Sequence, residues 1–319
     1  MMDVSVEFLR VLSRILPILF LMLLGNFMRR KRVLKEATIG ELKRVVVNFA
    51  LPSLLFVAFL DIRLKVSYLV IFLVVFAVTN FMFWYGKSLK RRLGIEEEYF
   101  HFLTSGFEYG MVGVALFGSV YGVDSVGYLG IVDIGQEMFV WFILLAALIS
   151  HRDNVKSVGN MVKSFFEAPV IIAILLGFLF NALGQRENLY RFFLTGSVLY
   201  TMRLLGSLTV PLILIIIGYG IRINGSAVRQ ALTVVGVRFV VLIPLAVFLN
   251  VFLLDHLLHL ERILQAALFT LFILPPPFIV PLYIKDENVQ ALEYTNNVLM
   301  MYTLFSVSVF IAYLFVTWG

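Results

Sequence analysis

The strongest constraint on the fold is that one apolar pattern occurs twice along the chain. Pro17 and Pro169 are each followed, eight residues later, by the glycine of the same Leu-Leu-Gly sequence. Pro52 and Pro211 then lie in the next apolar segment of each half, 159 residues apart. Duplicated membrane units of this kind are typical of secondary transporters. The pattern therefore predicts two equivalent halves, residues 1–160 and 161–319.

Composition sets the environment of these halves, because 61% of the 319 residues are hydrophobic and only 14% are charged. A soluble domain does not have this composition. At about 20 residues per membrane span, the apolar residues suffice for about ten helices. We expect an all-α membrane protein with ten spans near residues 8–28, 40–60, 66–86, 99–121, 126–149, 165–184, 196–221, 230–254, 262–284 and 289–317.

The distribution of basic residues predicts the orientation of these spans. Lys and Arg are more frequent in the odd-numbered loops, which we therefore expect to be cytoplasmic, with both termini extracytoplasmic. Each half has an odd number of spans, so the second half should be inverted relative to the first. The net charge of +6 then reports orientation in the membrane and is no argument for a nucleic-acid partner.

The fourth expected span contains residues that interrupt a helix. Gly106, Gly110 and Gly113 lie within eight residues of one another, with Glu108 among them. Glycine costs about 1 kcal/mol at an interior helix position. Small residues alone would also fit close packing between helices, but a carboxylate among them favours a break with a function.

The ninth expected span contains Pro275, Pro276 and Pro277 in succession. Three prolines remove three backbone donors, so a continuous helix cannot pass, although a kink or a helix end is the simpler alternative. Breaks in equivalent spans of the two halves indicate a central binding site. The residues expected to bind substrate at the breaks are Glu108, Tyr109, Gly110 and the three prolines.

Polar residues recur at the same position of each half. The first half contains Asp133, Gln136 and Glu137, and the second half contains Glu293, Asn296 and Asn297 at positions 160 residues later. In each set the spacing favours one helix face. We expect the amides of Gln136, Asn296 and Asn297 to contact substrate.

The acids Glu108, Asp133, Glu137 and Glu293 are candidates for proton or ion coupling. Acids inside a membrane are costly and are usually functional, and burial with mutual repulsion favours retention of a proton on at least one of them. Two alternatives stay open: Glu293 is an interfacial residue, or Asp133 and Glu137 form structural ion pairs with Arg203 or Arg238.

Short segments along the whole chain resemble the auxin efflux carrier family, the PIN-like transporters. They are Asn48–Pro52 in the second span, Gly113–Gly122 in the fourth, Asp133 with Gln136 in the fifth, and Pro276, Ile279–Pro281 and Lys285 in the ninth. Each motif is weak alone, but together and in this order they are fairly specific.

The resemblance implies a fold related to bile-acid sodium symporters, with two inverted five-helix repeats. Spans 1, 2, 6 and 7 would form a scaffold that pairs into a homodimer, and spans 3–5 and 8–10 a moving transport domain. The broken fourth and ninth spans would cross at the substrate. The implied substrates are organic acid anions, such as auxin, malate or malonate, moved across the cell membrane by an elevator mechanism.

One departure from the family pattern concerns Glu108, which stands where the family has an asparagine. At an effective dielectric constant of about 20, two like charges 4 Å apart repel by about 4 kcal/mol. An ionised Glu108 would therefore oppose a substrate carboxylate. Either Glu108 is protonated when the anion binds, or the substrate is cationic or zwitterionic, or the side chain points elsewhere. We favour the first, because it couples the anion to a proton.

Other classes of function are less consistent with the sequence. A sodium-coupled symporter of the bile-acid type remains an alternative, because Asp133, Gln136 and Glu137 offer oxygen ligands, and so does a passive channel. The motifs of zinc, serine and aspartyl membrane proteases are absent, so we do not expect an enzyme. The chain has no cysteine, and nothing indicates a cofactor or a metal centre.

Overall fold

The protein is described by a computed structural model that covers residues 2–62, 65–153, 167–220, 225–285 and 287–318. Its described residues are largely helical and contain no strand. Six helical segments in the described residues are long and apolar enough to cross a membrane, while the expected number of ten spans remains a prediction. The six segments are Glu36–Asp61, Tyr68–Leu93, Val123–Arg152, Phe193–Gly220, Val228–Leu257 and Val289–Thr317. The expected boundary between the halves, at residues 160 and 161, lies outside the described residues.

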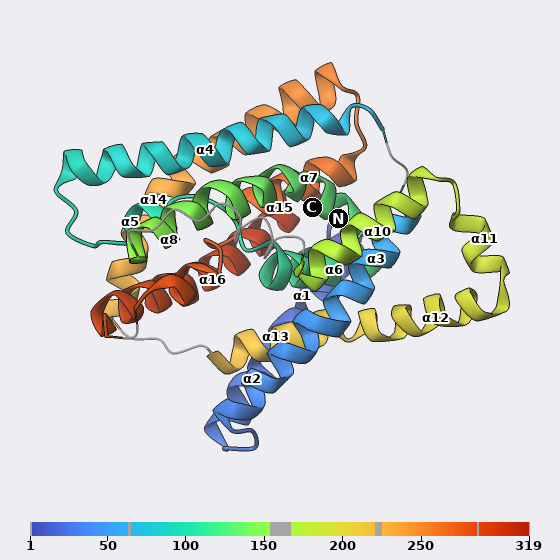
Figure 1. Cartoon of the computed structure of the whole chain (residues 1–319), viewed down its shortest axis with the longest axis horizontal. Helices are drawn as coiled ribbons and strands as arrows, with labels where there is room; N and C mark the ends of the chain where they lie inside the picture. The colour runs from blue at the N-terminus through green and yellow to red at the C-terminus, as the bar shows by residue number, and fades with distance from the viewer. Residues whose placement is uncertain (1, 63–64, 154–166, 221–224, 286, 319) are drawn as a thin grey trace.

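The helices gather into two groups (Figure 1). The first group contains α1 (Met2–Arg30), α2 (Glu36–Val45), α3 (Leu51–Asp61), α10 (Pro169–Ala182), α11 (Arg186–Arg191), α12 (Phe193–Ser207) and α13 (Thr209–Gly220). A π-helical turn, Val46–Ala50, makes α2 and α3 continuous. Within this group α1 packs along α13, and α3 packs along α10 and α12.

The second group contains the remaining helices. They are α4 (Tyr68–Leu93), α5 (Phe100–Leu103), α6 (Val114–Tyr121), α7 (Val126–Phe139), α8 (Leu145–Asp153), α14 (Gly225–Phe248), α15 (Arg262–Ile273) and α16 (Val289–Trp318). π-Helical turns at Tyr109–Gly113, Val140–Leu144 and Leu249–Leu257 extend α6, α7 and α14, and short 3-10 turns lie at Val123–Ser125 and Val280–Tyr283. Here α4 packs on α7, α7 on α15, and α14 on α16, while α6 packs against α13 and α1 of the first group as well as against α7.

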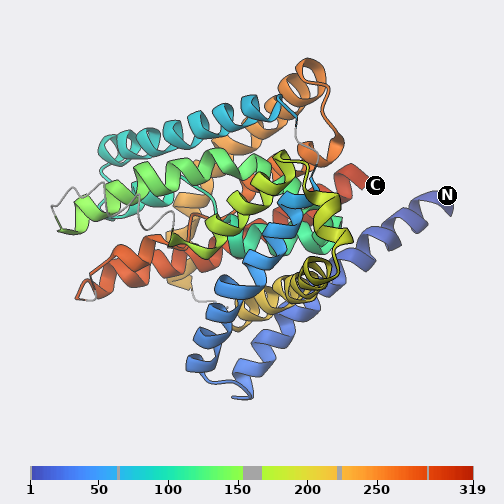
Figure 2. The same ribbon diagram turned by 45° about the vertical axis from the view of Figure 1, so that its right-hand side comes forward.

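The glycines of the repeated Leu-Leu-Gly sequence have a clear packing role. A Cβ at Gly25 would collide with the backbone of Ile215 and Tyr219 in α13, and a Cβ at Gly177 would collide with the backbone of Phe56 in α3. Glycine therefore allows close backbone approach in both places. The turned view in Figure 2 shows α1 running diagonally across this first group.

A polar cluster fixes the outer end of the first group. The Asp61 carboxylate at the end of α3 accepts from Arg186 at 2.8 Å, from Arg203 at 2.7 Å and from the Tyr190 hydroxyl at 2.9 Å. The hydrogen bond from Arg186 to Asp61 raises the pKa of the Arg186 guanidinium. Arg186 begins α11, the short helix that connects the apolar helices α10 and α12 along the chain. One carboxylate thus joins α3 to α11 and α12.

Candidate functional site

The helix of the fourth expected span is interrupted, as the sequence predicted. Helix α5 ends at Leu103, and regular turns resume only at Tyr109. Gly106, within the interruption, has φ of +67°, and a Cβ there would lie 2.7 Å from Cγ of Pro277. Both the left-handed conformation and the contact require glycine at this position.

The ninth expected span is interrupted as well. Helix α15 ends at Ile273, and the three prolines that follow are buried and extend to the 3-10 turn at Val280. The backbone N–H of Glu108 donates to the Pro275 carbonyl at 2.8 Å, and the rings of Phe107 and Phe272 stack with centroids 5.4 Å apart. The two interruptions therefore touch, and we call residues 104–108 and 274–279 together the crossover.

The carboxylate of Glu108 lies inside the crossover and joins its two segments. Its Oε1 accepts from the backbone N–H of Met111 at 3.1 Å, in the first turn of the half-helix that follows. Its Oε2 accepts from the backbone N–H of Phe278 at 2.7 Å, in the other interruption. Of the three alternatives for Glu108, the one in which its side chain points away from the crossover does not agree with the structure, because one oxygen binds the Phe278 N–H inside it and the other binds the Met111 N–H just beyond it.

Gln136 of α7 supports the first interruption from the side. Its Oε1 accepts from the Phe107 N–H at 3.1 Å, and its Nε2 donates to the Phe107 carbonyl at 3.0 Å. One amide thereby satisfies both backbone groups of a buried residue that has no helical partner.

The Arg238 guanidinium of α14 binds the carbonyl ends of both interrupted helices. It donates to the Leu274 carbonyl at 3.0 Å, to the Leu103 carbonyl at 3.4 Å and to the Tyr302 hydroxyl at 3.1 Å. The guanidinium also lies 5.1 Å from the ring centroids of Phe107 and Tyr302. A cation is favourable where helices end, because the last carbonyls carry partial negative charge.

The sequence left open that Arg203 or Arg238 pairs with Asp133 or Glu137, and neither arginine does so. Arg203 binds Asp61, and Arg238, which is fully buried, binds the carbonyls and hydroxyl just described. The role of Arg238 at the crossover was not predicted. The only signal for it is an arginine in the middle of an apolar helix.

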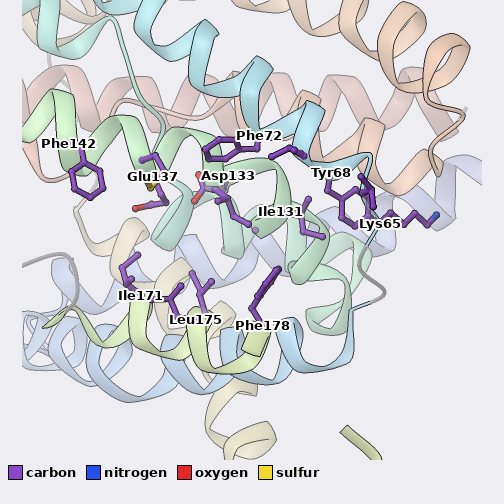
Figure 3. A pocket seen from close by; sticks show the side chains of 16 residues that line it. Lys65, Tyr68, Phe72, Ile131, Asp133, Glu137, Phe142, Ile171, Leu175 and Phe178 are labelled. Atoms are coloured by element: carbon purple, nitrogen blue, oxygen red, sulfur yellow. The ribbon is translucent and has the colours of Figure 1, made fainter. Parts of the chain in front are cut away.

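Asp133 and Glu137 line a cavity of about 640 Å³ between α4, α7 and α10. Figure 3 shows both side chains on α7 facing Ile171, Leu175 and Phe178 of α10. Among the described residues no Lys or Arg forms an ion pair with either acid. Glu137 accepts from the Trp141 indole N–H at 2.8 Å.

Three polar atoms at or near this cavity are buried and lack hydrogen-bond partners among the described residues. They are Oδ1 of Asp133 and the hydroxyl oxygens of Tyr68 and Tyr109. The Tyr109 hydroxyl lies against Gly130 of α7, less than one turn before Asp133. A polar ligand, water or a proton bound here would supply the missing partners.

Comparison with known proteins identifies the class of this structure. The model of a family described as "Membrane transport protein" matches residues 10–160 and 155–313. The chain belongs to this family, that of the auxin efflux carriers and PIN-like proteins. The chain is also similar to a protein of Methanothermobacter thermautotrophicus described as an "Uncharacterized transporter", with 30% identity over 238 residues that cover 71% of this chain and 74% of the relative.

In this family member, the second polar set lies in different surroundings from the crossover. Glu293 and Asn296 are exposed on α16, and Asn297 donates to the Gln230 side chain at 3.1 Å. No described hydrogen bond joins these three side chains to the crossover. The described residues also include no cluster of three or more His, Asp or Glu side chains arranged for a metal ion.

Proposed function

We propose that the protein is a secondary active transporter that carries a small organic acid anion through the crossover. The observation that supports this most is the position of the Glu108 carboxylate, held by N–H groups of Met111 and Phe278. Two converging N–H groups, one of them in the first turn of a half-helix, are a suitable receptor for a carboxylate. Because a carboxylate fits there, a cargo carboxylate of similar size would fit as well.

We propose an elevator-type movement for this transport. The first group of helices, α1–α3 with α10–α13, would be a static scaffold that pairs with a second copy of the chain. The second group, α4–α8 with α14–α16, would be the transport domain that carries the crossover across the bilayer. Each of the two inverted five-helix repeats, residues 1–160 and 161–319, would contribute helices to both domains, with the termini extracytoplasmic in the cell membrane.

The acids of the site suggest how a proton would be coupled to the cargo. Glu108 would be protonated when the anion binds, because two carboxylates in contact repel strongly in a buried site. Asp133 and Glu137 have no described basic partner and border a cavity of about 640 Å³. They are suitable carriers of protons between this cavity and Glu108.

Transport by purified full-length protein in proteoliposomes tests this function. Labelled malate, malonate and indole-3-acetate are offered with a pH gradient, a sodium gradient or no gradient. We expect saturable uptake of at least one acid that a proton gradient drives and sodium does not. Uptake driven by sodium alone would favour the symporter alternative, and single-channel conductance far above carrier turnover would favour a channel.

The pH dependence of the same assay tests Glu108 directly. Glu108→Gln removes the ionisable group and keeps the size of the side chain. We expect its uptake into vesicles preloaded with the same acid to depend much less on pH than that of the wild type. An unchanged pH profile would show that Glu108 does not carry the proton.

A further inference from the structure

Side chains of the protein bind both N–H and carbonyl groups of the crossover without any cargo. Glu108 accepts from the N–H group of Met111, just after the first segment, at 3.1 Å and from that of Phe278, in the second segment, at 2.7 Å. Arg238 donates to carbonyls that end both interrupted helices, at 3.0 and 3.4 Å. Gln136 satisfies both backbone groups of Phe107 between them. The positive and the negative ends of the interruption are therefore each occupied by a side chain of opposite charge.

The place that Glu108 occupies can hold only one carboxylate. Its two donors, Met111 and Phe278, come from segments that lie far apart in the sequence and meet only at the crossover. Each N–H offers a single proton, so a free carboxylate and the Glu108 carboxylate cannot both be bound by this pair. Like charges would also repel at this distance in a buried site.

We propose that Glu108 is a tethered stand-in for the cargo carboxylate. It fills the receptor formed by the Met111 and Phe278 N–H groups in the empty carrier, and a single carboxylate group of the cargo displaces it. This inference rests on the proposed function, because it assumes that the cargo is an acid. To the proposed function it adds the atoms that bind the cargo, which are the N–H groups of Met111 and Phe278, and the group that competes with the cargo for them, which is the Glu108 carboxylate.

The stand-in has a consequence for the transport cycle. An empty crossover with free N–H ends would be costly to move through the bilayer, because unpaired backbone donors are unfavourable there. With Glu108 in place the N–H groups of Met111 and Phe278 are bonded, so the empty transport domain can return. The protein therefore supports net transport of the acid and does not depend on exchange of one acid for another.

The surroundings of Glu108 provide polar partners for a loaded state. The Tyr109 hydroxyl and Oδ1 of Asp133 are buried and have no hydrogen-bond partner among the described residues. Tyr109 directly follows Glu108, and its hydroxyl lies against Gly130 of α7. A protonated Glu108 that leaves the receptor, or the polar part of a bound cargo, would supply partners to these atoms.

Chemical rescue tests the receptor without knowledge of the natural cargo. Glu108→Ala empties the receptor, and sodium propionate is the probe for the purified full-length protein, with propionamide as its neutral counterpart. We expect the variant to have a lower melting temperature than the wild type, and propionate but not propionamide to restore it. The wild type should respond to neither compound, because its own carboxylate occupies the site.

A matched control is Glu98→Ala. The Glu98 carboxylate also binds two partners, the side chains of His151 and Asn288, but it is exposed and lies outside both interruptions. Propionate should not stabilise this variant. Equal effects of propionate and propionamide on Glu108→Ala, or equal effects of propionate on both variants, would overturn the proposal and make Glu108 a fixed helix cap.

Glu108→Gln gives a second measurement should the alanine variant not fold. If Glu108 occupies the receptor in at least nine of ten wild-type molecules, removal of its charge raises the affinity for a transported acid at least about tenfold. In proteoliposomes the variant should keep acid-for-acid exchange and lose net efflux. Unchanged affinity and unchanged net efflux would refute the stand-in role.

The two sets of measurements separate this inference from the proposed function. Rescue of Glu108→Ala by propionate, with no transport of any acid tested, would support the receptor and contradict the transport of acids. Transport by the wild type without rescue and with normal net efflux in Glu108→Gln would support the proposed function and overturn the stand-in.

Discussion

Substitution of Gln136 by methionine should destabilise the crossover more than any other conservative change on α7. Methionine fills nearly the same volume but can neither accept from the Phe107 N–H, now at 3.1 Å, nor donate to its carbonyl, now at 3.0 Å. Phe107 is 2% exposed, so water cannot replace these bonds. Each orphaned buried backbone group costs about 1 to 3 kcal/mol, so the two together cost about 2 to 6 kcal/mol.

The measurement is the melting temperature of the purified protein in detergent, followed by size-exclusion chromatography after heating. We expect a decrease of several degrees for Gln136→Met and about half of it for Gln136→Glu at neutral pH. An ionised glutamate accepts from the N–H but cannot donate to the carbonyl, so acidification should stabilise Gln136→Glu relative to Gln136→Met. Gln290→Met, at an exposed position of α16, is the control. The reasoning fails if Gln136→Met and Gln290→Met melt at the same temperature.

Three further changes test other parts of the structure. Gly106→Ala should lower the free energy of unfolding by about 2 to 5 kcal/mol, because alanine is strained in the left-handed conformation and its Cβ would overlap Pro277. The measurement is the melting temperature, and a variant as stable as the wild type would contradict the φ of +67°. Arg238→Met should destabilise by about 2 to 4 kcal/mol through orphaned helix-end carbonyls, with Arg238→Lys intermediate in the same thermal assay. Asp61→Asn should weaken the attachment of α11, which faster hydrogen exchange in Arg186–Arg191 would report, while equal exchange would exclude that role.

The interruptions themselves could be predicted from the sequence, because their causes are local. Three successive prolines lack the N–H groups that a helix needs, and Pro275–Pro277 do end α15. The glycines around Glu108 also indicated a break, and Gly106 adopts a conformation that favours glycine. The sequence suggested one cavity for Glu108, Asp133 and Glu137; Asp133 and Glu137 line a cavity, and Glu108 is not among its lining residues.

The partners of each polar residue could not be predicted, because helical spacing gives a face but not the neighbour that the face meets. Asp133, Gln136 and Glu137 were assigned one face, yet Gln136 binds Phe107 while the two acids line the cavity. Arg238 was considered as an ion-pair partner, and its binding to carbonyls depends on where two distant helices end. The inverted arrangement of the repeats remains a prediction.

The contact between α1 and α13 has a mechanical consequence. Gly25 lies against the backbone of Ile215, and Gly218 of the facing helix lies against the backbone of Met22, so each helix presents a notch that receives the other. These close backbone contacts at glycine resist sliding of the two helices along their axes, since a shift would bring a backbone carbonyl of one helix against a Cβ-bearing residue of the other. We expect the pair to behave as one stiff beam, and large displacements within the protein to occur at surfaces that lack such interlocks.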